Sequence, residues 1–177
     1  GQIGMRDWPK PEMLELLAIA QHHGVPTRLL DFTYDPLIAL YFAADDIIKN
    51  RTNYEENGLA EMAVWCVNLH EMFKMRSNLG IVEVGRSKNP FLYAQKGLFL
   101  LDKFHDSHSN GMAMSLDERI NRLYRGEHIE SVVMKFTMPI DQAQNAIDEL
   151  AYIGIDRPHL MPTYDNVVAY LKGLEEV

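Results

Sequence analysis

The chain has 177 residues, of which 47% are hydrophobic and 24% charged, and a formal net charge of -8 at pH 7. This composition is typical of a globular protein, and the acidic balance disfavours nucleic acid as a partner, because the nucleic-acid backbone binds surfaces rich in Lys and Arg. The single cysteine excludes an intrachain disulfide and favours a reducing, cytoplasmic compartment, and the absence of any apolar run of about 18 residues argues against a membrane span.

A first helix is expected just after the N-terminus. Pro9 and Pro11 suit its beginning, because the missing N–H of proline costs nothing in the first turn. Helical spacing places four apolar residues on one stripe: Met13, Leu16, Leu17 and Ala20. Gly24 and Pro26 are expected to end the helix.

A second helix is expected to begin at Asp35 and Pro36, as N-cap and first helical residue. Residues 37–44 are apolar on all sides, which predicts a helix that is buried all round. Residues 49–58 are polar and are expected to form a loop.

Four strands are predicted further along the chain. Residues 62–67 are continuously apolar, as in a central strand, and residues 81–84 and 98–101 are shorter candidates. In residues 131–138, two sets of side chains alternate, which predicts a half-buried strand.

The remaining segments predict an exposed loop at 102–111 and helices at 116–124, 143–150 and 165–174. This order lacks the regular strand–helix alternation of a doubly wound fold. We therefore expect a single α+β domain over residues 1–177, with a small mixed or antiparallel sheet packed with several helices. No glycine-rich phosphate loop is present.

Polar side chains are concentrated between the first two helices. His22 and His23 are adjacent, so on a helix they point about 100° apart and cannot share a metal ion, and no metal site is assigned. Arg28 and Asp31 are three residues apart, which allows an ion pair in a turn or a short helix. That pair either orders the loop or receives a ligand. Thr27 and Thr33 suit helix caps or ligand contacts.

Gln95 and Gly97 interrupt a second apolar stretch. A glycine at this point indicates close approach of the backbone or a bulge. The Gln95 side chain either faces a pocket or satisfies backbone groups, and the second role is the more common one.

Residues 18–44 read AIAQHHGVPTRLLDFTYDPLIALYFAA, which closely resembles the signature of the FRG domain family. NPFLYAQKGLF at 89–99 looks like the second block of that family, which is built on Gln-x-Gly-x-Phe. KFTMPIDQAQNAIDELAYIGIDRPHLMPTYDNVVAYL at 135–171 is similar to the third block. The three blocks are spread from residue 18 to residue 171, so the resemblance extends over nearly the whole chain.

One departure concerns the aromatic-Arg-Gly motif for which the family is named. That motif precedes the Gln-His block in the family and is missing here, whereas the YRG at 124–126 lies on the wrong side of the block. The chain also begins with Gly1 rather than Met. We therefore expect a fragment truncated at its N-terminus, with an incomplete site if the upstream arginine belongs to it.

The resemblance implies an uncharacterised bacterial domain, and its layout resembles remotely that of ADP-ribosyltransferase-like folds. By this fold-level analogy, Arg28, Asp31 and Gln95 are the candidate catalytic residues. Gln21, His22, Thr27 and Thr33 are the candidate residues for binding a nucleotide such as NAD. Gln95 stands where a transferase needs a carboxylate, and a neutral amide cannot act as a general base.

Two functions therefore remain open at this stage. In the first, the chain is an enzyme, or a degenerate relative of one, that binds a small nucleotide ligand such as NAD in a polar pocket. In the second, it is a protein-interaction or scaffold module, and the same polar residues are structural. Keeping so many polar groups inside favours a pocket, whereas the missing catalytic group favours the module.

Overall fold

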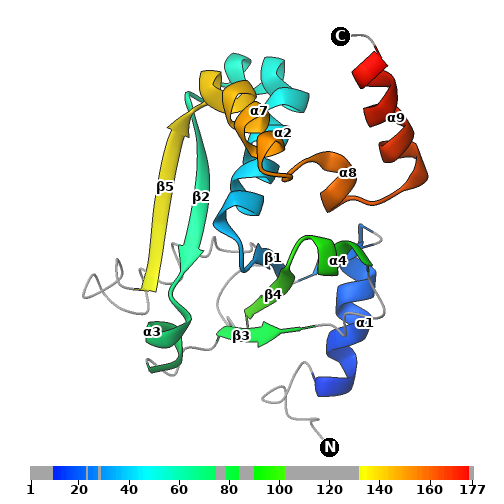
Figure 1. Cartoon of the computed structure of the whole chain (residues 1–177). Coiled ribbons are helices and arrows are strands. Elements are labelled where there is room, and N and C mark those ends of the chain that lie inside the picture. The colour runs from blue at the N-terminus through cyan, green and yellow to red at the C-terminus, as the bar shows by residue number, and fades with distance from the viewer. Residues whose placement is uncertain are drawn as a thin grey trace, which may run out of the picture. The chain divides into compact units, whose positions relative to one another are not determined.

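The computed structural model describes residues 10–22, 24–27, 29–74, 79–83, 90–102 and 132–175. The chain divides into two compact units. Unit 1 comprises Gly1–Leu30, Trp65–Val82 and Phe99–Lys135. Unit 2 comprises Asp31–Val64, Glu83–Leu98 and Phe136–Val177. Figure 1 shows the elements along the chain.

Helix α1 (Pro11–His22) in unit 1 begins at the proline that the sequence indicated. The predicted apolar stripe is only partly correct. Leu16 is 63% exposed, and Ala18, which lies outside the stripe, is buried. The Gly24 N–H donates to the Gln21 carbonyl at 2.9 Å, and Gly24 has a φ of +80°, so the glycine ends the helix as expected.

Helix α2 (Pro36–Glu56) in unit 2 starts with the predicted cap, because the Asp35 Oδ1 accepts a hydrogen bond from the Leu37 N–H at 3.0 Å. The loop predicted at 49–58 is wrong, since α2 continues to Glu56 through a kink at Asn50. Polar residues hold this extension as exposed i, i+4 pairs, such as Arg51 Nε with Glu55 Oε1 at 2.8 Å.

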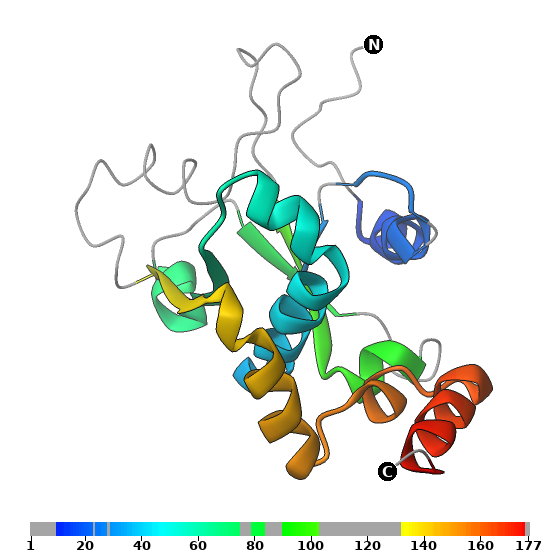
Figure 2. The same cartoon turned by 90° about the horizontal axis from the view of Figure 1, so that it is seen from above.

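The main layer of unit 2 is formed by α2 and α7 (Ala143–Tyr152), which pack against each other (Figure 2). Residues 37–44 are not buried all round, because Leu37 is 42% exposed. Among the described residues of unit 2, buried side chains gather in two apolar clusters. The first contains Ala44, Ile47, Met62, Ile140 and Ala143, and the second contains Ile38, Tyr41, Leu150 and Leu160.

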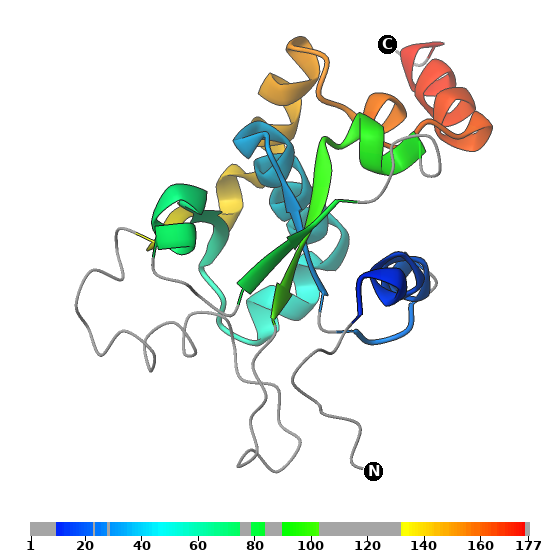
Figure 3. The ribbon, with the colours of Figure 1, turned by 90° about the horizontal axis from the view of Figure 1, so that it is seen from below.

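A three-stranded sheet has the order β1 (Leu29–Thr33), β4 (Gly97–Asp102), β3 (Leu79–Val82), as Figure 3 shows from below. In unit 1, β3 and β4 are antiparallel, with Leu79 opposite Asp102 and Val82 opposite Phe99. Leu98 to Leu101 of β4 are all buried, as suits a central strand. A Cβ on Gly97 would lie 2.7 Å from Leu92 Cδ2 of α4 (Pro90–Ala94), which confirms the close approach expected there.

A second sheet pairs β2 (Glu61–Val67) with β5 (Val133–Pro139), which run in opposite directions in Figure 1. Both strands were predicted, but β2 is not central, because its sheet has only two strands in the described part of the chain. The half-buried pattern predicted for residues 131–138 is also wrong, since the adjacent Val132 and Val133 are both buried and both Met134 and Phe136 are exposed. The side chains of a two-stranded ribbon are buried only where another part of the chain packs on its face.

Short helices complete the fold. Helix α3 (Leu69–Lys74) follows β2, a 3-10 turn (Ile140–Gln142) precedes α7, and α8 (Arg157–Leu160) and α9 (Tyr164–Glu175) end the described chain. Asn68 caps α3, since its Oδ1 accepts from the His70 N–H at 3.1 Å.

The architecture is α+β with small antiparallel sheets, as predicted. Residues 103–111 of the predicted loop and the helix predicted at 116–124 lie outside the described residues. None of the described helices combines the length and apolar character needed to cross a bilayer.

Candidate functional site

Two of the predicted nucleotide-binding residues lie together in unit 1. The Thr27 hydroxyl donates to the Gln21 side-chain carbonyl, and it also accepts from the Leu29 N–H at 3.1 Å. These bonds connect the last turn of α1 with the start of β1. Thr27 and Gln21 therefore hold the loop between a helix and a strand, where each is partly buried.

Thr33 and Gln95 lie together in unit 2. The Thr33 hydroxyl donates to the Gln95 backbone carbonyl at 2.8 Å and accepts from the Asp35 N–H at 3.0 Å. Next to them, the Tyr34 N–H donates to the Lys96 carbonyl at 3.1 Å. The end of β1 is thus joined to the turn between α4 and β4. We call this set, with Asp35 and Lys96, the Thr33–Gln95 junction.

The Gln95 side chain extends the junction to a third segment. Its Nε2 donates to the Leu160 carbonyl at the end of α8, at 3.1 Å, and its backbone N–H donates to the Phe91 carbonyl at 2.9 Å. Of the two roles considered for Gln95, the structure shows the bond to a backbone group. The side chain is partly buried and connects residues 65 positions apart in the sequence.

Lys96 has an unusual backbone. Its φ is +47°, in the left-handed region that L-residues other than Gly, Asn and Asp rarely adopt. Its Nζ lies 2.7 Å from Asp35 Oδ2, in an ion pair whose lysine side chain is 60% exposed. A surface pair of this kind stabilises the chain by about 0–1 kcal/mol. The left-handed conformation costs roughly 1–2 kcal/mol, so the ion pair does not offset it. The turn is therefore held by its neighbours rather than by Lys96 itself.

Two substitutions at Lys96 separate the energy of the ion pair from the cost of the left-handed backbone. Lys96→Ala loses the ion pair and keeps the backbone cost, whereas Lys96→Gly loses the pair and removes that cost. We expect the glycine variant to have the higher free energy of unfolding, by about 1 kcal/mol. Urea denaturation of both variants measures the difference, and an alanine variant as stable as the glycine variant would contradict it.

Asp35 should make the stability of the chain depend on pH in the acid range. The hydrogen bond from Lys96 lowers the pKa of Asp35 below its ordinary value of 3.8, together with the Leu37 and Ile38 N–H groups and the Lys96 charge, although burial opposes this. A carboxyl whose pKa is lowered on folding stabilises the protein above its unfolded pKa. This stabilisation is lost as the pH falls through the folded value.

The matched variant is Asp35→Asn, because asparagine caps helices as well as aspartate does but carries no charge. We expect the urea midpoint of the native chain to exceed that of the variant near neutral pH. The difference should shrink once the pH falls below the ordinary pKa of 3.8. A difference that stays constant across this range would show that Asp35 acts only as a cap.

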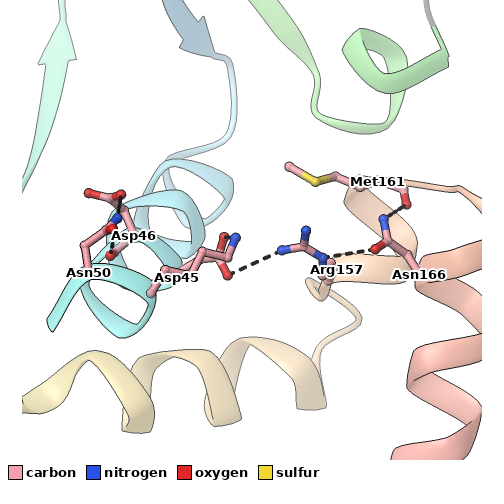
Figure 4. A network of polar contacts seen from close by, with 7 residues as sticks. Asp45, Asp46, Asn50, Arg157, Met161 and Asn166 are labelled. Carbon is pink, nitrogen blue, oxygen red and sulfur yellow. Dashed lines mark hydrogen bonds and ion pairs between the residues drawn. The ribbon is translucent and has the colours of Figure 1, made fainter.

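A second polar network in unit 2 connects α2, α8 and α9 (Figure 4). Arg157 lies between Asp45, with Nη1 3.8 Å from the Asp45 Oδ1, and Asn166, whose Oδ1 accepts from the Arg157 Nε at 3.1 Å. Asn166 in turn donates to the Met161 carbonyl at 2.8 Å. Arg157 thus binds its carboxylate through one nitrogen atom at long range, unlike the two-bond contact that arginine makes with a phosphate or carboxylate ligand.

Next to this network, Asp156 is the buried polar residue among the described part of the core. Its Oδ1 accepts from the His159 N–H at 3.0 Å and lies 2.6 Å from the His159 Nδ1, so it caps α8 and orients the imidazole. Burial, with the charges of Asp45 and Asp156, raises the pKa of the nearby Tyr41 to about 12, although Arg157 lowers it. The phenol of Tyr41 is therefore neutral at physiological pH.

The remaining predicted site residues are placed only in part. Asp31 is exposed and lies on β1, so the spacing argument for a turn or short helix does not apply to it. Arg28 lies outside the described residues, as does His23, and the His22 side chain is not described. The Arg28–Asp31 ion pair therefore stays a prediction. Among the described residues, no group of three or more His, Cys, Asp or Glu could hold a metal ion.

Sequence reasoning missed Lys96, Arg157 and Asn166. A signal existed for α8, because Asp156 precedes Arg157 and a proline, the same pattern of cap and first-turn proline that marked α2 at Asp35. Nothing in the sequence indicated the left-handed Lys96, since glycine is the usual residue for that conformation.

The chain thus combines an α+β architecture with small antiparallel sheets and an internally bonded polar block, and its sequence carries a Gln-His/Thr-Arg-Leu-Leu-Asp signature. The family model of the FRG domain matches residues 4–52, which contain that signature. The resemblance to this family is thus confirmed over that segment. The likenesses at residues 89–99 and 135–171 lie beyond the match and stay predictions. No curated protein and no solved structure matches the chain.

Proposed function

We propose that the chain is a non-catalytic FRG-type module that binds other proteins, and that its polar block is structural. One observation supports this above all. Of the five described side chains of the predicted pocket, Asp31 is exposed, and the other four use their polar groups inside the chain: Gln21, Thr27, Thr33 and Gln95. A ligand at these positions would have to replace hydrogen bonds that connect β1, α4 and α8.

The chemistry of Gln95 also supports the module. An ADP-ribosyltransferase-like reaction would need a carboxylate at this position, and the amide has no basic group. Its Nε2 already donates to the Leu160 carbonyl. Turning the amide toward a ligand would leave that carbonyl without this donor, which costs about 1–3 kcal/mol where the carbonyl stays out of contact with water.

Exposed tyrosines in unit 2 are consistent with a protein partner. Tyr152 is 89% exposed at the end of α7, and Tyr164 is 93% exposed at the start of α9. Tyrosine is enriched in protein interfaces because it combines a large apolar ring with a polar hydroxyl group. Binding a protein through such side chains requires no catalytic group.

The test is thermal denaturation with NAD, ADP-ribose and nucleoside phosphates, each added separately. A nucleotide at a hundredfold excess over its Kd would stabilise the folded chain by about 2.7 kcal/mol and raise the Tm. We expect no shift from any of them. A shift that is abolished by Thr33→Val would overturn the proposal in favour of a nucleotide pocket at the polar block, provided that the variant is folded by circular dichroism.

A further inference from the structure

The end of α2 has the geometry of a glycine C-cap in unit 2. Asn57 is the C-cap directly after Glu56, the last helical residue, and Gly58 follows with a φ of +71°. The Gly58 N–H donates to the Glu55 carbonyl at 3.0 Å, and the Leu59 N–H donates to the Tyr54 carbonyl, also at 3.0 Å. This is the Schellman pattern, in which the positive φ favours glycine. The fold therefore places a glycine directly after an exposed asparagine.

An asparagine that precedes glycine can modify itself. The backbone nitrogen of the next residue attacks the side-chain amide carbon, ammonia leaves, and a five-membered succinimide ring forms. Water then opens the ring at either carbonyl to give aspartate or isoaspartate. Glycine makes this attack easiest, because it has no Cβ to shield its nitrogen, and no atom lies within 4 Å of the place where a Gly58 Cβ would be.

We propose that Asn57–Gly58 is a site of spontaneous deamidation and that the C-cap of α2 controls its rate. Both reacting groups are engaged in the folded chain. The Asn57 Nδ2 donates to the Asn53 carbonyl at 2.7 Å and to the Asn53 Oδ1 at 3.1 Å. The attacking nitrogen belongs to the Gly58 N–H, which is bonded to Glu55. The reaction therefore proceeds when the last turn of α2 opens, as helix ends do.

The product loosens the same turn. A carboxylate at position 57 cannot donate to the Asn53 carbonyl, and its charge lies at the negative end of the helix dipole, directly after Glu55 and Glu56. Isoaspartate also lengthens the backbone by one carbon atom, which disrupts the two capping bonds. Tyr54, in this turn, packs against the cluster of Ala44 and Ile47, so the change reaches the edge of the core.

The experiment incubates the 177-residue chain at mildly alkaline pH, with and without urea, and maps the modified peptides by mass spectrometry. Replacing an amide by an acid gives a characteristic mass gain. The sequence contains a second Asn–Gly pair at 110–111, and in urea both sites should react at similar rates, which calibrates the measurement. In the folded chain, we expect modification at Asn57 that is clearly slower than in urea.

Two variants test whether deamidation of Asn57 loosens the last turn of α2. Asn57→Asp imitates the main chemical change without waiting for the reaction, and we expect faster hydrogen exchange over residues 54–59 than in the native chain. Asn57→Gln keeps the amide and should show no mass gain at position 57 over the same period. The proposal is overturned if Asn57 stays unmodified in the folded chain until the urea sample has reacted completely, or if folded and unfolded chains react equally fast.

Discussion

Leu160→Ala is expected to lower the free energy of unfolding by about 2–5 kcal/mol, the range for removing a large buried aliphatic side chain. Leu160 is 3% exposed and packs in the second core cluster with Ile38, Tyr41 and Leu150. It is the last residue of α8, a helix of four residues that cannot be stable by itself. Its side chain therefore attaches α8 to the core, and the smaller residue leaves a cavity where α2 and α7 meet.

Urea denaturation measures this loss, and Tyr152→Ala provides the control. Tyr152 is also a large side chain on the last residue of a helix, α7, but it is 89% exposed. Its replacement should change the free energy of unfolding by no more than about 0.5 kcal/mol. Equal effects of the two variants would show that α8 is not attached through Leu160.

Local signals in the sequence were sufficient to predict elements whose ends are set by residues next to them in the chain, such as caps, first-turn prolines and glycines. Asp35 and Pro36 predicted the start of α2, because a cap and a first-turn proline act within three residues. Gly24 predicted the end of α1 for the same reason, through its positive φ. Apolar runs predicted β2 and β4, and helical periodicity predicted α7.

The errors arose where the deciding partner is distant in the sequence. The polar stretch after Lys49 was interpreted as a loop, but Tyr54 packs on the core and prolongs α2. β1 was missed because its polar Asp31 breaks the apolar pattern, and its place is set by pairing with β4. The exposure of Phe136 in β5 likewise depends on which distant segment packs on that face of the sheet, which no local pattern reports.

For the candidate site, the sequence likewise identified individual residues but not their distant partners. The sequence identified Thr33 and Gln95 as unusual polar residues in apolar surroundings, and the structure brings them together at 2.8 Å between hydroxyl and backbone carbonyl. Sequence alone could not decide whether such groups face a ligand or each other. Leu160 supplies the third partner from 65 residues away, and only the fold brings it there.

Gln95→Leu is the second substitution with a large expected effect. Leucine is similar in volume to glutamine but has no donor, so the Leu160 carbonyl loses the bond that it now accepts at 3.1 Å. We expect the free energy of unfolding to fall by about 1–3 kcal/mol, the cost of leaving a buried polar group without a partner. Gln144→Leu is the matched control, because Gln144 is exposed and its Nε2 donates to the side chain of Asp148, in the same helix, at 2.8 Å. A Gln95→Leu variant as stable as this control would show that the amide is free to serve a ligand.

Gln95→Glu then distinguishes the two functions most sharply. If the junction is structural, the carboxylate cannot donate to the Leu160 carbonyl and the two oxygens repel each other, so this variant should be at least as unstable as Gln95→Leu. If the chain is instead a degenerate transferase, the same change restores the acidic group that such a reaction needs, and the variant should cleave NAD where the native chain does not. Denaturation and an NAD-cleavage assay on one purified variant give opposite answers under the two functions. We expect loss of stability and no cleavage, because the Gln95 amide is engaged in its bond to the Leu160 carbonyl.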